Sequence, residues 1–155
     1  MHMKALMHQN LGLLHYDISM SFAEGDGGDD APSHPLSNNS TTSSNSITAL
    51  EFSKAHLHQS YDHLKSSVSL FDESLQNSTE SSTLMEASYS IQLWAGVACT
   101  MKRYRDGTKL WDRAISHAYH SLQGINQGVR YDNLAAVLYN AGISLRSVSY
   151  THLRA

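Results

Sequence analysis

The sequence has a single cysteine, Cys99, so no disulfide can form within the chain, and we expect it to be a small buried apolar side chain. No apolar run reaches about 18 residues, so no membrane-spanning helix is expected. Polar and basic residues interrupt the stretch from Met1 to Leu14, so no signal peptide is expected either. Lys and Arg number 11 against 14 Asp and Glu, and the net charge of -3 does not favour binding to nucleic-acid phosphates. We therefore predict a chain of the reducing cytoplasm.

What is present indicates one globular domain with an unfolded segment. The 155 residues are 41% hydrophobic and 16% charged, which suits a chain that buries a core. Residues 24–46 are first acidic and glycine-rich, then contain both prolines, and then become rich in Ser, Thr and Asn. Such a segment buries too little apolar area to offset its ordering entropy, so we predict a disordered loop at 24–46. Residues 1–23 are expected to form an arm, with a short strand where apolar and polar residues alternate from His15 to Phe22.

From residue 47 to residue 147, apolar residues recur at intervals of three and four, which is the period of an amphipathic helix. Four helices are predicted. Their apolar seams are Leu50, Leu57, Tyr61, Leu64, Val68, Phe71 and Leu75; Leu84, Ala87, Ile91, Trp94, Ala98 and Met101; Leu110, Trp111, Ala114, Ile115, Ala118, Tyr119 and Leu122; and Leu134, Val137, Leu138, Ala141 and Leu145. Thr48 and Thr83, each followed by Glu three residues later, fit capping boxes, and Asp106–Gly107 is expected to separate the second helix from the third.

Helices of this length joined by short polar turns predict an all-α fold of antiparallel hairpins. No fixed repeat period is visible in the sequence, so irregular packing is expected in place of a strict tetratricopeptide array.

No residue pattern predicts catalysis, a cofactor or a metal. His56, His58 and His63 lie within two turns of one helix beside Asp62, but His58 points away from His56, since successive residues are about 100° apart around a helix. We expect these histidines to be surface residues, with a metal site as the weaker alternative. The glycines between Glu24 and Asp30 lie in an acidic segment, which would repel phosphate.

A basic stripe is one candidate interaction site. Lys102, Arg105, Lys109 and Arg113 are spaced three, four and four residues apart, so an unbroken helix would align them. An acidic protein or an anionic membrane surface could bind there, which would make the chain a peripheral membrane protein. The alternative is an ordinary solvated helix face, because Asp106 and Asp112 are interspersed and Gly107 interrupts the pattern.

The segment from Leu134 to Gly142, LAAVLYNAG, resembles the Ala-x-Val-Leu-(Phe/Tyr)-Asn-x-(Ala/Gly) segment of the Bro domain of ALIX-type endosomal sorting adaptors. Upstream, LWDRA from Leu110 to Ala114 is similar to the aromatic-Trp-x-Asp-Ala stretch of that family. Here Asp112 directly follows Trp111, which departs from the family pattern. The Tyr131–Asp132 pair also comes one residue early. The resemblance covers about a third of the chain.

The resemblance implies a curved helical adaptor that binds an ESCRT-III-like subunit and associates with endosomes. It implies structural roles for the matching residues: Trp111 and Asp112 before the last helix, Val137, Leu138 and Tyr139 in packing, and Asn140 as a polar bridge to a neighbouring helix. The alternative from the residues alone is an unrelated helical bundle or solenoid that binds a peptide or a second copy of itself.

The last residues, 148–155, resemble a translated sequencing-adapter read-through. We therefore expect the helical domain at 47–147 to be truncated. A Bro-type domain cut at this point would leave an apolar helix face uncovered, and self-association is expected from such a face.

Overall fold

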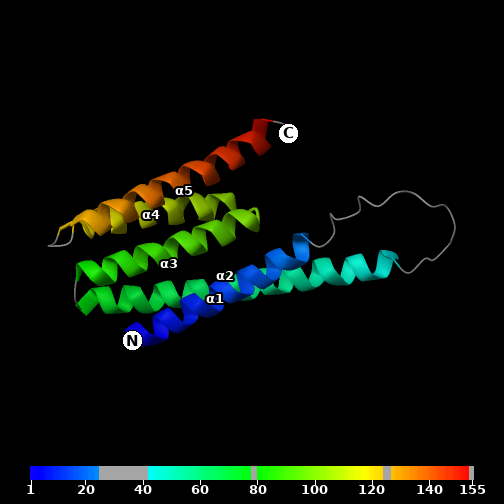
Figure 1. Ribbon diagram of the computed structural model, residues 1–155, viewed down its shortest axis with the longest axis horizontal. Coiled ribbons are helices and arrows are strands. Elements are labelled where there is room, and N and C mark those ends of the chain that lie inside the picture. The colour runs from blue at the N-terminus through cyan, green and yellow to red at the C-terminus, as the bar shows by residue number, and fades with distance from the viewer. Residues whose placement is uncertain (25–41, 78–79, 124–126, 154–155) are drawn as a thin grey trace.

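The computed structural model is all-α, as predicted, and its helices stack in chain order (Figure 1). The helices are α1 (His2–Glu24), α2 (Thr42–Asn77), α3 (Ser81–Thr100), α4 (Tyr104–His120) and α5 (Gln127–Leu153). The structure describes the backbone of residues 1–24, 42–77, 80–123 and 127–153, and the side chains of residues 1–22, 48–77, 80–123 and 131–146. Residues 25–41 of the predicted 24–46 loop lie outside the described residues. Within the described backbone, no helix combines the length and hydrophobicity needed to cross a bilayer.

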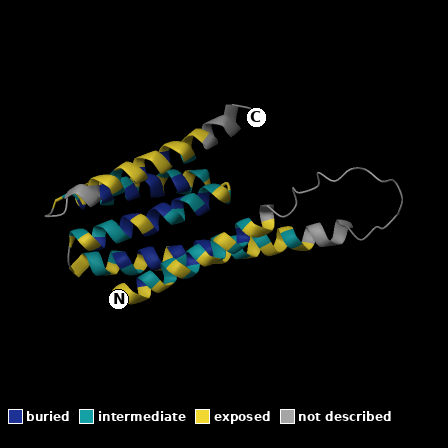
Figure 2. Ribbon diagram, viewed as in Figure 1, coloured by how far each residue is buried: buried dark blue, intermediate teal, exposed yellow. Residues whose placement is uncertain are grey.

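The apolar core lies between α2, α3 and α4, with α5 packed over α3 and α4. The predicted seams supply its main residues: Leu64 and Val68 from α2, Ile91 from α3, and Trp111 from α4 are all buried. Small residues bring α3 and α4 close together, and Ser88 Oγ donates a hydrogen bond of 2.9 Å to the carbonyl oxygen of Ala114 across this interface. Figure 2 shows buried residues concentrated on the facing sides of these helices.

The strand prediction at the N-terminus was wrong. Residues His2–Glu24 form one helix, and the alternating segment from His15 to Phe22 belongs to it. The bounds of the loop predicted at 24–46 were also wrong, because Glu24 is helical and α2 begins at Thr42. Thr48 therefore lies inside α2 and does not cap it. Thr83 is likewise inside α3, whose N-cap residue is Glu80.

The break between the second and third predicted helices falls at Lys102, five residues before the glycine that was expected to cause it. Lys102 has φ of 60°, the left-handed conformation that commonly ends a helix. Its backbone N–H donates to Cys99 O at 2.9 Å, and that of Arg103 donates to Ala98 O at 2.8 Å, which is a Schellman cap. Gly107 lies in the first turn of α4, where a Cβ atom would stand 2.6 Å from Cys99 Sγ. Close helix packing, and not a turn, requires this glycine.

A repeat of seven residues joins α1 to α2. Three serines of α2 donate hydrogen bonds to backbone carbonyl oxygens of α1: Ser53 to Ser19 at 2.9 Å, Ser60 to Gly12 at 2.7 Å, and Ser67 to Ala5 at 2.8 Å. Numbers fall along α1 as they rise along α2, so the helices are antiparallel. We call these six residues the serine seam. The interface is tight, since a Cβ at Gly12 would lie 2.6 Å from Leu64 Cγ.

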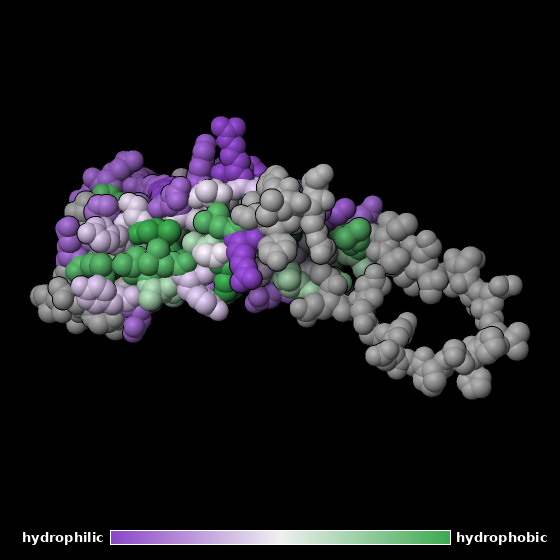
Figure 3. All heavy atoms as spheres, turned by 90° about the horizontal axis from the view of Figure 1, so that it is seen from above, coloured by the Kyte–Doolittle hydropathy of each residue, from purple (hydrophilic) through white to green (hydrophobic). Residues whose placement is uncertain are grey.

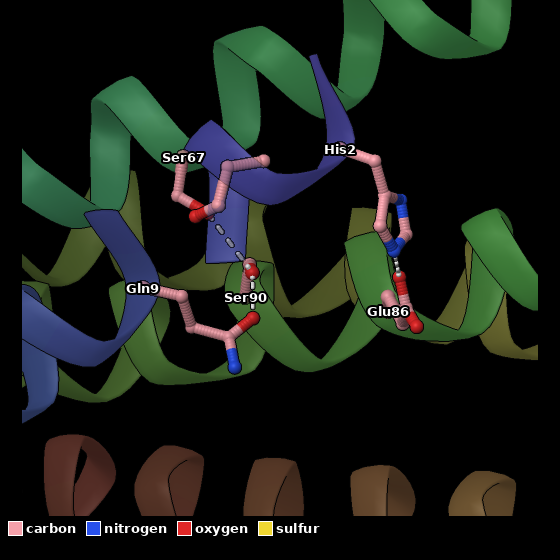
Figure 4. Close-up of polar contacts among 6 residues, drawn as sticks. His2, Gln9, Ser67, Glu86 and Ser90 are labelled. Atoms are coloured by element: carbon pink, nitrogen blue, oxygen red, sulfur yellow. Dashed lines mark hydrogen bonds and ion pairs between the residues drawn. The ribbon is translucent and has the colours of Figure 1, made fainter. Parts of the chain in front are cut away.

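Polar contacts also tie α1 to α3 (Figure 4). Ser90 Oγ donates to Gln9 Oε1 at 2.5 Å and lies 3.3 Å from Ser67 Oγ, which connects α3 to both preceding helices. At the start of α1, His2 Nε2 is 2.8 Å from Glu86 Oε2. Hydroxyl groups, an amide and small side chains therefore help to set the position of α1, together with the partly buried Leu6 and Tyr16.

Candidate interaction surface

The residues carried over from the Bro resemblance divide into buried and exposed ones. Trp111 and Val137 are buried in the core, as a structural role requires. Leu138 is 50% exposed and Tyr139 is 70% exposed, so the expected packing of Tyr139 is not present among the described residues. Asp112 and Asn140 are also exposed. This side of α5 is therefore a surface, and only its inner side packs.

The basic stripe is not continuous. Lys102 lies in the turn before α4, because the helix breaks there. Arg113 is paired with Asp72 of α2, which neutralises it. Arg105 and Lys109 remain as exposed neighbours on α4. Two adjacent cations are a common feature of a solvated helix and do not distinguish a binding site.

The predicted histidine group is rearranged by α1. His58 is exposed and its Nδ1 lies 2.8 Å from Lys54 O of its own helix, while His56 and His63 face α1. There they meet His15 and His8, which sequence analysis did not connect with them. Among the described residues, no three His, Cys, Asp or Glu side chains lie where they could share one metal ion. Asp62 is exposed beside this group.

The outward face of α3 is unusually free of charge. Glu86 is the only charged residue in Ser81–Thr100. Tyr89, Leu93 and Gly96 follow one another at helical spacing on this face, and Tyr89 is 45% exposed. A helix face that serves only as a solvated surface usually carries charged residues. A face of this composition is instead typical of a contact surface.

Two hollows adjoin this face of α3. The first, of about 180 Å³, lies against α1 and is lined by Leu13, Tyr16 and Asp17 of that helix. The second, of about 360 Å³, lies against α5 and is lined by Asn140, Ile143 and Ser144 of that helix. Both are lined by Gln92, Leu93 and Gly96, so they are the two sides of one depression along α3. We call it the α3 groove.

Glycine at position 96 keeps the groove open. A Cβ atom built there would meet nothing within 4 Å, so no packing within the fold requires the glycine. An unnecessary glycine inside a helix costs about 0.5–1 kcal/mol relative to alanine. Close approach of another helix or a peptide to the backbone is one reason for a glycine at such a position.

The outer side of α5 is a second exposed apolar surface. Tyr131, Leu138 and Leu145 recur every seven residues and are all exposed, beside the buried side that carries Val137 and Ala141. Figure 3 views the molecule from the α5 side and shows a band of hydrophobic residues among polar ones. We call these three residues the α5 flank.

The comparisons with known proteins add no relative. The chain matches no protein-family model, no curated protein and no solved structure. Its function is therefore inferred from the surfaces described above.

Proposed function

We propose that the chain is a non-catalytic protein-interaction scaffold that binds one amphipathic helix of a partner in the α3 groove. The observation that carries the proposal is the uncharged face of Tyr89, Leu93 and Gly96 at the bottom of a depression walled by α1 and α5. A helix laid in a groove is a recurrent mode of peptide recognition, with apolar anchors at positions i, i+3 or i+4, and i+7.

The charges around the groove define the partner further. Asp17 is the only charged residue among those that line the two hollows. The partner helix would therefore present an apolar face to Leu93 and a basic residue to Asp17. Rim charges of this kind affect mainly the association rate and the salt dependence of binding.

The test uses a synthetic peptide with leucines at i, i+3, i+4, i+7 and i+11 and lysines on the opposite face. A scrambled peptide of the same composition is its control. Binding is measured by calorimetry with the wild type, with Gly96→Leu, which fills the groove, and with Gly142→Leu. Gly142 is a matched control because a Cβ there also meets nothing within 4 Å and it does not line the groove.

We expect the amphipathic peptide to bind the wild type and Gly142→Leu alike, and Gly96→Leu at least about tenfold more weakly, a difference of about 1.4 kcal/mol. Equal binding to both variants, or equal binding of the scrambled peptide, would contradict the proposal. The chain can also be tested for dimerisation that depends on concentration. Dimerisation that is lost in Leu138→Glu would assign the α5 flank to self-association. The peptide experiment alone would then decide whether the groove binds a helix.

The Bro resemblance supplies a more specific candidate partner. We propose from it that the scaffold acts in endosomal sorting and takes a helix of an ESCRT-III-like subunit. Buried Trp111 and Val137 suit the structural roles that the resemblance implies, whereas exposed Tyr139 does not. Calorimetry with a purified ESCRT-III-like subunit tests this step separately. Binding that Gly96→Leu weakens and Gly142→Leu does not would support it, and no binding by the peptide-competent wild type would refute it.

A further inference from the structure

Four histidines form two hydrogen-bonded pairs across the α1–α2 interface. His15 Nδ1 lies 2.8 Å from His56 Nδ1, and His8 Nδ1 lies 3.1 Å from His63 Nδ1. The ring centroids are 5.1 Å apart in the first pair and 5.4 Å apart in the second. In both pairs the distance between the centroids is 2.3 Å longer than the distance between the two Nδ1 atoms. This excess is about two ring radii, which places both centroids and both Nδ1 atoms of a pair almost on one line. A line of this kind is the geometry of an N–H···N hydrogen bond.

The two pairs are also in contact with each other. The rings of His15 and His63 have centroids 5.4 Å apart and planes at 4°, so the four imidazoles form a continuous row. Phe52 packs edge-on against His56 at one end, with ring centroids 4.4 Å apart. We call His8, His15, His56 and His63 the histidine row. It repeats every seven residues beside the serine seam.

Each imidazole pair needs one neutral acceptor. In an N–H···N bond one ring donates its Nδ1–H and the other accepts with a lone pair. A first proton can be added at the free Nε2 of the donor ring, but a second must go to the accepting Nδ1, which then faces another N–H. The docked helices therefore hold at most one proton per pair, whereas separated helices can hold four in the row. The stacked His15 and His63 make even two protons unfavourable.

The groups around the row do not relieve this conflict. Burial lowers the pKa of His15 first, and the positive charges of His56 and His63 lower this pKa further. Asp62 and Lys65 line an open hollow with His8, one charge of each sign. Asp17 of α1 faces the α3 groove. Among the ion pairs of the described residues, only that of His2 with Glu86 involves a histidine; it joins α1 to α3 and strengthens when His2 is charged, so it opposes release.

We infer that the histidine row is a proton-sensitive clasp that holds α1 on α2 near neutral pH and releases it in mild acid. The difference approaches two protons as the separated histidines become fully charged, so below about pH 6 the release equilibrium should change by nearly 100-fold per pH unit. Release would uncover Leu64 and Phe71, which α1 covers. It would also remove the α1 wall of the α3 groove, a consequence that rests on the proposed function.

The experiment measures hydrogen-exchange protection factors of α1, corrected for intrinsic exchange, in the chain without any partner. We expect protection in α1 to fall about 100-fold between pH 6 and pH 5, while Ile91 and Leu110 lose much less of theirs. The variant His15→Asn with His56→Asn replaces one titrating pair by two amides, which can hydrogen-bond at the same position and do not titrate. Its fall should be at most about tenfold.

The control is His58→Asn with His120→Asn, which removes two histidines bonded within their own helices, to Lys54 O and Ser116 O. It should keep the full 100-fold fall. Unchanged protection of α1 at pH 5, or the same fall in both double variants, overturns the inference. Should the first variant not fold, His8→Asn with His63→Asn, which replaces the other pair, decides: a fall as large as that of the wild type would overturn the inference. Because no partner is present, this result does not depend on whether the groove binds a peptide.

Discussion

Gly12→Ala tests the close packing of α1 on α2. Elsewhere in a helix this change stabilises the folded state by about 0.5–1 kcal/mol, because alanine has less conformational freedom to lose. At Gly12 the new Cβ would lie 2.6 Å from Leu64 Cγ, 3.0 Å from Leu64 Cδ2 and 3.3 Å from Ser60 O. Leu64 is fully buried and Ser60 O belongs to the backbone of α2, so neither can move without shifting the helix.

Overpacking of this kind costs about 1–3 kcal/mol, and a shift of α2 would also lengthen the hydrogen bond from Ser60 Oγ to Gly12 O, whose net value is about 1 kcal/mol. After the gain in propensity, Gly12→Ala should lower the free energy of unfolding by about 1–2 kcal/mol. Gly142→Ala is the matched control and should raise it by about 0.5–1 kcal/mol, since nothing lies within 4 Å of its Cβ. Urea denaturation at pH 7.5 measures both. Equal stability of the two variants would refute the close contact.

Three further predictions concern the rest of the fold. Lys102→Gly should raise the free energy of unfolding in urea by about 1 kcal/mol, because glycine adopts the positive φ of this cap without strain; a loss of stability would contradict the cap. Burial raises the pKa of the Cys99 thiol, so the native chain should react with a thiol reagent at pH 7.5 more slowly than its urea-unfolded form, and equal rates would exclude burial. Burial lowers the pKa of His117, and the charge of Arg113 lowers this pKa further. The Nε2 atom of His117 is also buried without a hydrogen-bond partner. The contribution of neutral His117 to stability is therefore present above about pH 6.5 and is lost as the pH falls below that value. His117→Leu should therefore stabilise the fold more at pH 5 than at pH 7.5, and an equal effect at both pH values in urea would contradict this assignment.

The helices whose buried sides are made of large apolar residues could be predicted from the sequence. Leu64, Val68 and Phe71 of α2 recur at three-four spacing and are buried, as are Ile91 of α3 and Trp111 of α4. The last predicted seam was half right, since Val137 is buried and Leu138 is exposed. The apolar residues of this seam occupy a wide sector around α5, and the neighbouring helices cover only part of that sector. Which part stays exposed is decided by tertiary packing.

The helix α1 could not be recognised by the same rule. Its buried positions are Ala5, Gly12 and Ser19, which carry little hydrophobic signal, and the apolar residues between them produced the apparent strand pattern. A signal was nevertheless present. Serines at 53, 60 and 67 and histidines at 8 and 15 and at 56 and 63 all recur every seven residues, which is the spacing of facing positions in paired helices. Searching for small and polar residues at this interval would have paired α1 with α2.

The α3 groove was missed for a related reason. Its residues Tyr89, Leu93 and Gly96 lie beside the buried seam of α3 and look like a wider seam in the sequence. That they form an exposed depression depends on α1 and α5 lying on either side of α3 without covering it, which three-dimensional packing alone determines. The glycine at 96 is no distinguishing sign by itself, because Gly142 of α5 likewise has nothing within 4 Å of its Cβ position.

The two ways of packing divide the molecule into parts with different responses to acid. The contacts of α2, α3, α4 and α5 are mostly apolar, so protonation changes few of them, with His117 of α4 as an exception. The contacts of α1 include hydroxyl bonds to backbone carbonyls, small side chains and the histidine row, beside apolar contacts of Leu6 and Tyr16. Protonation of the row therefore changes a larger share of the contacts that hold α1 than of the contacts within the core. Acid should thus act on α1 and on the groove wall that it forms before it affects the remaining helices.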